Sequence, residues 1–531
     1  MQKNDKQNIV LTGFMGTGKT SVGKRLASEL NRKFVDTDEL IQERQGISIP
    51  EIFRQHGEAA FRKMESDIAR ELGQQEGLVI STGGRLMLDP ANAAALSQKG
   101  RVFCLVATPQ EILSRIKKDK EHTRPLLEVP NPSEHIVELL KERQQGYNRF
   151  QKIITDDKDP AEVTSHLLDM FREHPKRISI DHPAHPYDYV VGSGILPFVR
   201  QLAEVPGPLV VITDTTVNEL YGQSCGEVDH IITIPVGNQH KTLATVQDIY
   251  DQLLDIGFDR SGTIMALGGS VVGDIAGFVA ATYMRGVNLI QCPTSLLAMA
   301  DTCIGGKTSI DLARGKNLIG AFKQPSVVIA DIALLQSLPH REFISGMAEV
   351  IKHGLIADSD LLEKVINGDW HTEAATLHTS LFELQALVAQ AIQVKVSIVR
   401  EDPMDRGIRF SLNLGHTFAH AIEQVSGYTI RHGEAVAMGL VASVNLSARL
   451  GHCGADLQQR LETVLAGVGL PVRIPGLSTE ELLKAMENDK KRVGKINRFV
   501  LLGKIGQPFT ADNVDTRAVI DTLKEITTSS D

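Results

Sequence analysis

The sequence predicts an α/β fold built from three units: a parallel-sheet domain, a second α/β domain and a mainly α-helical domain. Short apolar runs alternate with helical patterns over residues 1–174 and again over 187–338. This alternation is typical of parallel sheets that carry helices on both faces. Beyond residue 338 the strand patterns nearly vanish and long helical patterns take their place, which predicts the third unit.

Length and composition agree with several globular units and exclude some function classes. The chain has 531 residues, whereas single domains usually have about 100 to 200. Hydrophobic residues make up 42% and charged residues 23%, which is ordinary for globular proteins. The formal net charge of -9 disfavours a general polyanion binder, so phosphate groups must be recognised by local cations. We expect small-molecule substrates and no nucleic-acid partner.

The cysteines and the hydropathy pattern favour a cytoplasmic protein. The five cysteines show no CxxC spacing, which argues against a disulfide framework and against a thiolate zinc site. No stretch approaches the roughly 20 apolar residues of a membrane span, and the polar beginning MQKNDKQN does not read as a signal peptide. We therefore expect no membrane association and a reducing compartment.

In the first unit, strands are expected at apolar runs that helical patterns follow. These runs are residues 9–11, 78–81 and 102–107. A helical pattern over 161–173 ends the unit, and the polar stretch after it contains three prolines. Because a helix cannot continue through them, we place the first domain at 1–174 and a linker at 175–186.

The second and third units follow the linker. Four strand candidates lie in the second α/β domain, expected at 187–338, and they are PLVVITD, HIITIPV, GTIMALGG and NLIQCP. Long helical patterns over 377–400 and 434–450 indicate the mainly helical domain, expected at 339–531.

A phosphate-binding loop is predicted near the beginning of the chain. Residues 13–20, GFMGTGKT, fit the pattern GxxxxGK[ST], and they lie between the apolar run IVLTG and the helical pattern SVGKRLASEL. Glycines let backbone N–H groups close around phosphate oxygens, and the helix N-terminus adds positive potential. Lys19 would meet the transferred phosphate and Thr20 would offer a hydroxyl to magnesium. Motif and position together favour a P-loop NTPase-type domain over a plain glycine-rich turn.

Two carboxylates follow the next strand candidate. Asp36 and Asp38 come directly after KFV, so both lie at a strand end. One of them can hold the shell of a magnesium ion while the other accepts a proton from a substrate hydroxyl. A solvated acidic turn remains the alternative from the residues alone.

The first unit resembles shikimate kinases over about residues 7–172, through GFMGTGKT, DTD, FRKME, STGG and TRPLL. The resemblance implies ATP binding by Gly16, Thr17, Gly18, Lys19, Thr20 and Arg124, the last as a lid arginine. It implies magnesium binding by Thr20 and Asp36. It implies shikimate binding by Asp38, Arg62, Gly84 and Arg143, with Asp38 as the base for the acceptor hydroxyl. Two positions depart from the family pattern: its third glycine is Arg85, and Gly146 replaces a proline.

A second glycine-rich segment, ALGGSVVGDIAGFVAATYMRG, follows the pattern of a strand, a tight turn and an apolar helix. It is a plausible dinucleotide cradle, although it does not satisfy GxGxxG. The segment IGGKT mimics the end of a P-loop, but Asp301 occupies the position of the first glycine. We therefore reject a second ATP site.

Ionisable residues gather on three apolar helical patterns, GMAEVIKHG, NLGHTFAHAIE and IRHGEAVAMG. Zinc binds imidazole and carboxylate readily, and a catalytic site keeps three protein ligands and an open position. Spacing alone pairs His416 with His420, which lie four residues apart on one helical face. The alternative is that these histidines are ordinary core residues.

The stretch from about 187 to 510 resembles 3-dehydroquinate synthases, through LGGSVVGD, YMRG, PTSLLAMADTCIGGKTSID, GKNLIGAF, GMAEVIKHG, LNLGHTFAHAIE, HGEAVAMG and DKKR. The resemblance implies an NAD-binding α/β domain, a metal-binding helical domain and a homodimer. It assigns the metal, Zn2+ or Co2+, to Glu349, His416 and His432. His420 is then left to contact substrate phosphate and help proton transfer.

The same resemblance implies two larger sets of contacts and the catalytic groups. Substrate would be bound by Arg285, Asp301, Lys307, Asn317, Lys352, Lys395, Arg409, Asn413, His420 and Lys490 or Lys491. NAD+ would be bound by Asp214, Thr215, Thr216, Val236, Gly237, Asn238, Gln239, His240, Lys241, Ser270, Val271, Val272, Gly273, Asp274, Thr294, Ser295, Lys307, Lys316, Leu334, Leu335, Gln336 and Ser337. The catalytic groups across both units would be Lys19, Asp38, Lys352, Asp405 and His420.

The two resemblances together imply a bifunctional enzyme. The first unit would phosphorylate shikimate with ATP and Mg2+, and the rest would convert 3-deoxy-D-arabino-heptulosonate 7-phosphate to 3-dehydroquinate with NAD+ and a divalent metal. Two alternatives stay open from the sequence. The second half could be a related sugar phosphate cyclase or a polyol dehydrogenase, and the first unit could be a regulatory module that senses ATP.

Overall fold

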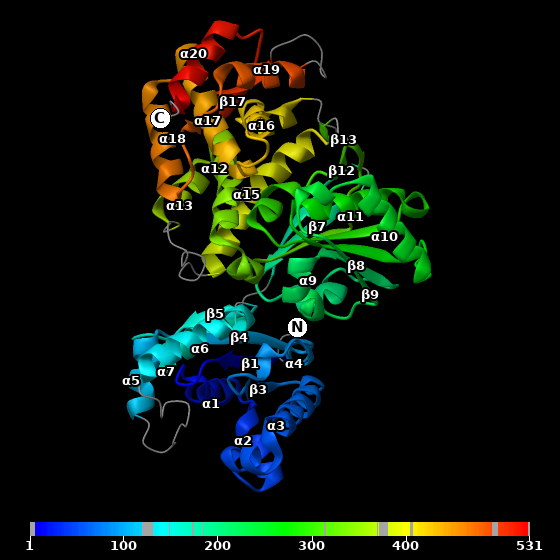
Figure 1. Cartoon of the computed structure of the whole chain (residues 1–531), viewed down its shortest axis with the longest axis vertical. Coiled ribbons are helices and arrows are strands. Elements are labelled where there is room, and N and C mark those ends of the chain that lie inside the picture. Colours follow the sequence, from blue (N-terminus) through cyan, green and yellow to red (C-terminus); the bar gives the residue numbers. More distant parts are fainter. Residues whose placement is uncertain are drawn as a thin grey trace.

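The computed structural model describes residues 6–118, 131–147, 149–172, 175–183, 185–312, 315–368, 370, 381–403, 407–490 and 498–528. In Figure 1 the first unit lies at the bottom of the molecule and the last helices lie at the top. The three units expected from the sequence are all α/β or helical as predicted.

The first unit is a five-stranded parallel sheet with the strand order β2-β3-β1-β4-β5. The strands are β1 (Asn8–Gly13), β2 (Lys33–Asp36), β3 (Leu78–Ser81), β4 (Gly100–Val106) and β5 (Gln151–Ile154). The helices are α1 (Lys19–Leu30), α2 (Thr37–Gln45), α3 (Ile49–Gly73), α4 (Pro90–Ser97), α5 (Pro109–Lys118), α6 (Pro132–Tyr147) and α7 (Pro160–Arg172). Strand β1 is central and buried along its whole length, so its carboxyl end presents the phosphate loop in the middle of the sheet edge.

The second unit is a seven-stranded sheet with the order β6-β7-β14-β11-β10-β8-β9. All neighbouring strands are parallel except β6, which runs antiparallel to β7. The strands are β6 (Lys176–Ile180), β7 (Tyr187–Gly192), β8 (Leu209–Asp214), β9 (His230–Ile234), β10 (Thr263–Gly268), β11 (Asn288–Pro293) and β14 (Val327–Asp331). The hairpin of β12 (Lys307–Leu312) and β13 (Gly315–Phe322) forms a two-stranded sheet of its own.

Strand β6 lies inside the segment 175–186 that the sequence analysis treats as a linker. Its side chains are exposed and buried in alternation near the end of the strand, as expected for an edge strand with one face on the core. The sheet of the second unit therefore begins within this segment. Pro175 precedes the strand, and Pro183 and Pro186 follow it.

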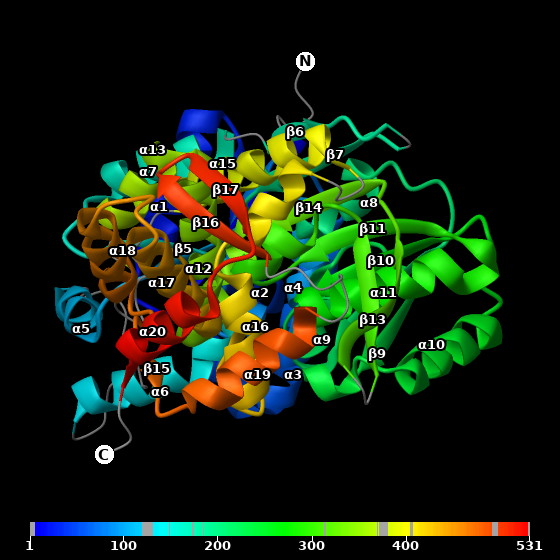
Figure 2. The same ribbon diagram turned by 90° about the horizontal axis from the view of Figure 1, so that it is seen from above.

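Helices dominate the third unit, as the sequence predicts. They are α12 (His340–Ala357), α13 (Ser359–Asn367), α15 (Leu381–Glu401), α16 (His416–Val425), α17 (His432–Arg449), α18 (Ala455–Val468), α19 (Thr479–Lys490) and α20 (Thr516–Ile526). Figure 2 shows α17 surrounded by α12, α16, α18 and α20, and nearly all of its residues are buried. A hairpin of β16 (Arg498–Lys504) and β17 (Gln507–Asp512) was not predicted.

Helix α15 is long and apolar enough to resemble a membrane span by length and composition. However, 67% of its most apolar 18-residue window is buried inside the protein. It packs against α12 and against the short helical turns of the second unit, so its apolar character serves the core.

The kinase-like unit and the second unit touch each other. Helix α4 packs against residues Gly222–Ser224, and Gln98 donates a 3.0 Å hydrogen bond to Glu227. The backbone N–H of Lys152 in β5 donates to the side chain of Gln336 at 3.3 Å. One buried apolar cluster continues from α7 through β6 and β7 into the following units. The halves therefore share a packed boundary.

Candidate active sites

The phosphate loop joins β1 to α1 and has the backbone that its glycines permit. Gly16 and Gly18 have φ values of 77° and 93°, in the left-handed region that favours glycine. The ammonium of Lys19 donates to the carbonyl oxygens of Gly13 and Phe14, both at 2.9 Å. Lys19 is thus already folded over the loop in which phosphate oxygens would lie.

A candidate magnesium position lies beside the loop. The hydroxyl of Thr20 donates to Oδ2 of Asp36 at 3.3 Å. The other oxygen of Asp36 accepts from the backbone N–H groups of Asp38 and Glu39, at 3.1 and 3.4 Å, and so caps helix α2. The cap fixes the carboxylate, which leaves one oxygen directed at Thr20 for a hydrated ion.

Asp38 is prepared for proton transfer by burial. Its Oδ1 atom is buried and accepts no hydrogen bond from the described residues. A Cβ atom at Gly83 would lie 2.5 Å from this oxygen, so the glycine leaves the space that Asp38 occupies. Burial, together with the nearby Asp36 and Glu65 carboxylates, raises the pKa of Asp38 to about 6. A pKa near the working pH suits a general base.

The two arginines assigned to shikimate lie in this part of the first unit, and they differ in their present contacts. Arg143 is buried, stacks on Phe14 with 5.1 Å between the guanidinium carbon and the ring centroid, and points toward Gly84. Arg62 is held by two carboxylates of its own helix, Glu65 at 2.6 Å and Glu58 at 2.9 Å. Arg143 is therefore prearranged for an anion, whereas Arg62 must exchange a glutamate for one. Arg124 lies outside the described residues.

A cleft of about 390 Å³ lies between the second and third units. Seven of the residues assigned to substrate line it: Asp301, Lys307, Asn317, Lys352, Lys395, Arg409 and Asn413. Asp274 and His416 complete its polar wall. Arg285 and His420 are not among its lining residues, and neither Asp405 nor the side chain of Lys490 belongs to the described part of the chain. Convergence of four basic side chains on one cleft suits a substrate with carboxylate and phosphate groups.

Three potential metal ligands meet beside the cleft, and one of them, His416, lines it. Glu349 comes from the middle of α12, and His416 and His432 are the first residues of α16 and α17. The Nε2 atoms of the histidines lie 3.4 and 3.5 Å from Oε1 of Glu349. Ligand atoms of all three residues lie within 4.8 Å of one another. The pairing of His416 with His420 from spacing alone is not found, since no three-ligand group among the described residues includes His420.

The electrostatics of this group fit a divalent cation. Glu349 is fully buried, and its oxygens form no hydrogen bond of good geometry with the described residues. Burial opposes ionisation of Glu349, but the Lys352 ammonium and the two imidazoles outweigh it and hold its pKa well below the usual range. One ionised carboxylate and two imidazole nitrogens together form a ligand set that suits zinc and cobalt.

A second charged group adjoins the metal ligands. Asp301 accepts from Lys395 at 2.8 Å, and Lys352 contacts Glu349. Burial opposes ionisation of Asp301, yet Lys395 and Lys352 hold its pKa below the usual range. Burial lowers the pKa of His353, whose Nε2 atom lies 3.8 Å from Oδ1 of Asp301, to about 4. The cleft therefore carries fixed charges of both signs beside the ligands.

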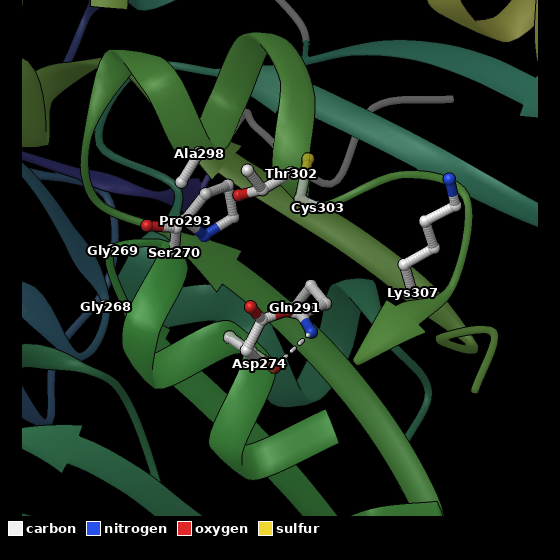
Figure 3. A pocket seen from close by; sticks show the side chains of 11 residues that line it. Gly268, Gly269, Ser270, Asp274, Gln291, Pro293, Ala298, Thr302, Cys303 and Lys307 are labelled. Atoms are coloured by element: carbon white, nitrogen blue, oxygen red, sulfur yellow. Dashed lines mark hydrogen bonds between the residues drawn. The ribbon is translucent and has the colours of Figure 1, made fainter. Parts of the chain in front are cut away.

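Most of the assigned NAD contacts share one edge of the seven-stranded sheet. They follow the carboxyl ends of β8, β9, β10, β11 and β14, the edge at which open parallel sheets bind nucleotides. Lys307 and Lys316 lie on the β12–β13 hairpin instead. Figure 3 shows Gly268, Gly269 and Ser270 at the turn into α11 (Ser270–Thr282), where Gln291 donates to the carbonyl of Gly273 at 3.2 Å. A Cβ atom at Gly269 would meet only the hydroxyl oxygen of Ser295, at an ordinary contact distance of 3.7 Å. The turn therefore leaves open space in which a ligand could lie.

A hydrogen-bond network joins the nucleotide edge to the substrate cleft. Lys241 donates to Asp274 and to Asn317, each at 2.5 Å. Ser309 donates to Asn317 at 2.7 Å and to Asp274 at 3.4 Å. Ser309 received no role from the sequence, although it lies within the quoted motif PTSLLAMADTCIGGKTSID. The sequence analysis also missed Glu423, although this carboxylate lies seven residues after His416 and hence on the same helical face.

Comparisons with known proteins agree with the two halves. The family model of shikimate kinase matches residues 15–172, and those of the N-terminal and C-terminal parts of 3-dehydroquinate synthase match residues 231–345 and 346–492. The 3-dehydroquinate synthase of Synechococcus sp. is 40% identical over 66% of this chain and 98% of its own length. That of Syntrophotalea carbinolica is 44% identical over 62% and 93%.

A solved structure supports the fold of the second and third units. The 2-epi-5-epi-valiolone synthase ValA from Streptomyces hygroscopicus, determined with NAD+ and Zn2+ bound, superimposes with a TM-score of 0.60. It is 24% identical and covers 64% of this chain and 96% of its own. At this identity the likeness concerns the fold, whereas the curated relatives favour the synthase over a related cyclase.

Proposed function

The chain belongs to the 3-dehydroquinate synthase family and carries a shikimate kinase domain before it, and we propose that the two sites described above perform the two reactions separately. The enzyme phosphorylates shikimate with ATP, and it converts 3-deoxy-D-arabino-heptulosonate 7-phosphate to 3-dehydroquinate and phosphate. The domains are assigned as 1–174 for the kinase, 187–338 for the NAD-binding part and 339–531 for the metal-binding part of the synthase.

In the kinase site, Asp38 is the base that accepts the proton of the shikimate hydroxyl. Its buried oxygen and its raised pKa support this role. Lys19 and the loop N–H groups hold the phosphates of ATP, and Thr20 and Asp36 hold the magnesium ion that accompanies it. Phosphoryl transfer needs positioning and charge stabilisation more than covalent chemistry, which is what these groups provide.

Carboxylate recognition in the kinase site falls to Arg143 and Arg62. A guanidinium group binds a carboxylate with two parallel hydrogen bonds, and Arg143 is already stacked and buried in place. Arg62 exchanges its contact with Glu58 for the substrate. Gly84 leaves room for the ring between these groups, and Arg124 closes over the phosphates of ATP.

In the synthase site, Glu349, His416 and His432 bind Zn2+ or Co2+, and the sheet edge around Ser270–Asp274 binds NAD+. The buried, ionised Glu349 and the two facing imidazoles support the metal assignment. The neighbour ValA, with NAD+ and Zn2+ bound, supports both groups. When bound, NAD+ would supply a reversible hydride acceptor and the metal ion would supply a Lewis acid for substrate hydroxyl oxygens.

The remaining cleft residues bind and orient the heptulosonate phosphate. Lys307, Lys352, Lys395 and Arg409 offer cations to its carboxylate and phosphate, and Asn413 offers an amide to its hydroxyls. Arg285, Asp405, His420 and Lys490 keep the roles that the resemblance implies, His420 in proton transfer at the substrate phosphate.

Assembly and location are proposed from the surface and the thiols. Large apolar side chains on the β12–β13 hairpin are exposed, with Leu318 at 41% and Leu312 at 39%, which supports a homodimer through the synthase half. Light scattering should give the mass of two chains, and the mass of one chain would contradict the homodimer. All five cysteines are free, which supports a cytoplasmic location.

The observation that carries the proposal is the separation of the two sets of described site residues, one in the first unit and the other in the second and third units. The test supplies the purified chain with shikimate and MgATP in one assay, and with the heptulosonate phosphate, NAD+ and Zn2+ in another. ADP should form in the first and inorganic phosphate in the second. Failure to form ADP would refute the kinase assignment, and failure to release phosphate would refute the synthase assignment.

A further inference from the structure

In both histidines of the metal group, the ring nitrogen that faces away from Glu349 has a hydrogen-bond partner. The Nδ1 atom of His416 lies 3.2 Å from the carbonyl oxygen of Leu414, and the Nδ1 atom of His432 lies 3.4 Å from Oε2 of Glu423. Each Nε2 atom faces Glu349. A ring nitrogen that donates to an acceptor fixes the tautomer of the imidazole and leaves the other nitrogen free to bind a metal. The two acceptors differ, because only Glu423 carries a charge.

Glu423 also reaches toward the second unit. It lies on α16, and its side chain is only 11% exposed. Its second oxygen, Oε1, lies 3.6 Å from the ammonium of Lys316 on β13. That ammonium in turn lies 3.8 Å from the ring centroid of Tyr428. One carboxylate therefore touches a metal ligand on one side and a cation of the nucleotide-binding part on the other.

Packing alone does not explain a charged residue at this position. A buried carboxylate is costly unless it is paired and hydrogen-bonded. Here each oxygen has its own partner, and the two partners come from different units, α17 and the β12–β13 hairpin. The geometry is that of a carboxylate–histidine–metal arrangement, in which the carboxylate orients the ligand and increases its basicity.

We propose that Glu423 is a positioning residue of the metal centre, which keeps Nε2 of His432 directed at the ion and ties this ligand to Lys316 at the NAD+ side of the cleft. The inference rests on the proposed metal centre. It adds to the three ligands a fourth residue that touches neither metal nor substrate.

The proposal predicts a loss of metal affinity when the charge is removed. Glu423→Gln keeps the size of the side chain but no longer provides an anion for His432. Removal of such an outer carboxylate typically weakens metal binding by about 10- to 100-fold. Glu423→Asp keeps the charge on a shorter stem and should recover part of the affinity. Lys316 loses its partner in Glu423→Gln, so NAD+ should also bind more weakly.

The experiment measures zinc dissociation constants of the full chain by competition with a chromogenic chelator. Glu462→Gln is the matched control. Glu462 lies on α18, is also partly buried and pairs with Arg473, and α18 belongs to no metal-ligand group among the described residues. The control should bind zinc like the wild type, and Glu423→Gln should bind it more weakly. Thermal unfolding of the metal-free variants and the visible spectrum of the Co2+ forms separate a misfolded variant from an altered ligand geometry.

The outcomes distinguish this inference from the proposed function. Equal zinc affinities and equal Co2+ spectra of wild type and Glu423→Gln would overturn the role of Glu423 and leave the metal centre intact. A wild-type chain that binds no zinc would overturn the metal centre and this inference together. A Glu423→Gln protein that unfolds early without metal, with Glu423→Asp as stable and as tight as wild type, would still support the charge requirement.

Discussion

Single side chains in both sites are prepared by their surroundings before any ligand binds. Asp38 is buried beside two other carboxylates, Glu349 is ionised by the cations around it, and Lys19 already lies over the phosphate loop. The surroundings thus shift the pKa values of the two carboxylates, that of Asp38 upward and that of Glu349 downward.

The raised pKa of Asp38 predicts the pH dependence of the kinase. A base must be ionised to accept a proton, so activity should be present above the pKa of Asp38 and should be lost as the pH falls through it. With a pKa of about 6, kcat/KM for shikimate should begin to fall near that pH, with a slope of one per pH unit. The pH profile of the kinase assay measures this.

The control is the synthase assay on the same chain, which shows whether the rest of the protein still functions. A kinase profile that stays flat down to the ordinary pKa of aspartate, 3.8, would contradict the role of Asp38 as a shifted base. The Asp38→Asn variant should lose kinase activity at all pH values while phosphate release by the synthase persists.

At the residue scale, the sequence predicted those groups that lie within continuous motifs. Lys19, Thr20 and Asp38 follow from the phosphate loop and the strand end, and the structure brings them together. Glu423 and Ser309 also lie within quoted motifs, but they were missed because their partners come from other elements, and one sequence without a structure does not show which elements meet. His432 illustrates the same limit, since spacing alone preferred His420.

Helix positions decide where the proposed metal ligands lie. His432 is the first residue of α17, and its neighbour Gly433 touches α12 so closely that a Cβ atom would lie 1.8 Å from the carbonyl oxygen of Ser345. The N–H of Gly433 also donates to the hydroxyl of Ser345 at 3.1 Å. The glycine therefore sets the distance between the helices that carry Glu349 and His432.

Gly433→Ala is predicted to disturb the metal centre through this contact. The added methyl group must push α17 away from α12, and overpacking of this kind typically costs about 1 to 3 kcal/mol. Zinc affinity and synthase activity should fall, and the midpoint of chemical unfolding of the synthase half should fall with them. Kinase activity should be unchanged, because the substitution lies in the third unit.

Gly467→Ala is the matched control. Gly467 also lies in a helix, α18, but a Cβ atom there would meet nothing within 4 Å. The change should leave zinc binding intact and stabilise the helix by about 0.5 to 1 kcal/mol. Zinc affinity that is equally reduced in both variants, or in neither, would contradict the role of the α12–α17 contact.

At the element scale, the sequence predicted most of the central strands and the long helices. Strands β1, β3, β4, β8, β9, β10 and β11 follow clear apolar runs, and the structure has them there. Strands β5, β6, β7 and β14 were missed, as were the hairpins β12–β13 and β16–β17. A run such as FVLLG has no periodicity that separates a strand from a buried helix, and the hairpin depends on a turn at Gly506 with a φ of 81°.

At the scale of the whole molecule, the two catalytic sites belong to different units that share a packed boundary. The boundary includes the contact of β5 with Gln336, in the loop assigned to NAD+, and the contact of Gln98 with Glu227. These pairs lie 184 and 129 residues apart in the sequence, so no local pattern predicts them. The relative placement of the units therefore had to come from the structure.

The central claim is that one chain carries two separate active sites. It is tested most directly by assaying both reactions on the full-length wild type and on two variants, Lys19→Ala and His432→Ala. Lys19→Ala should abolish ADP formation from shikimate and MgATP and leave phosphate release from the heptulosonate phosphate unchanged, and His432→Ala should do the reverse. Loss of both activities in either variant would contradict the account.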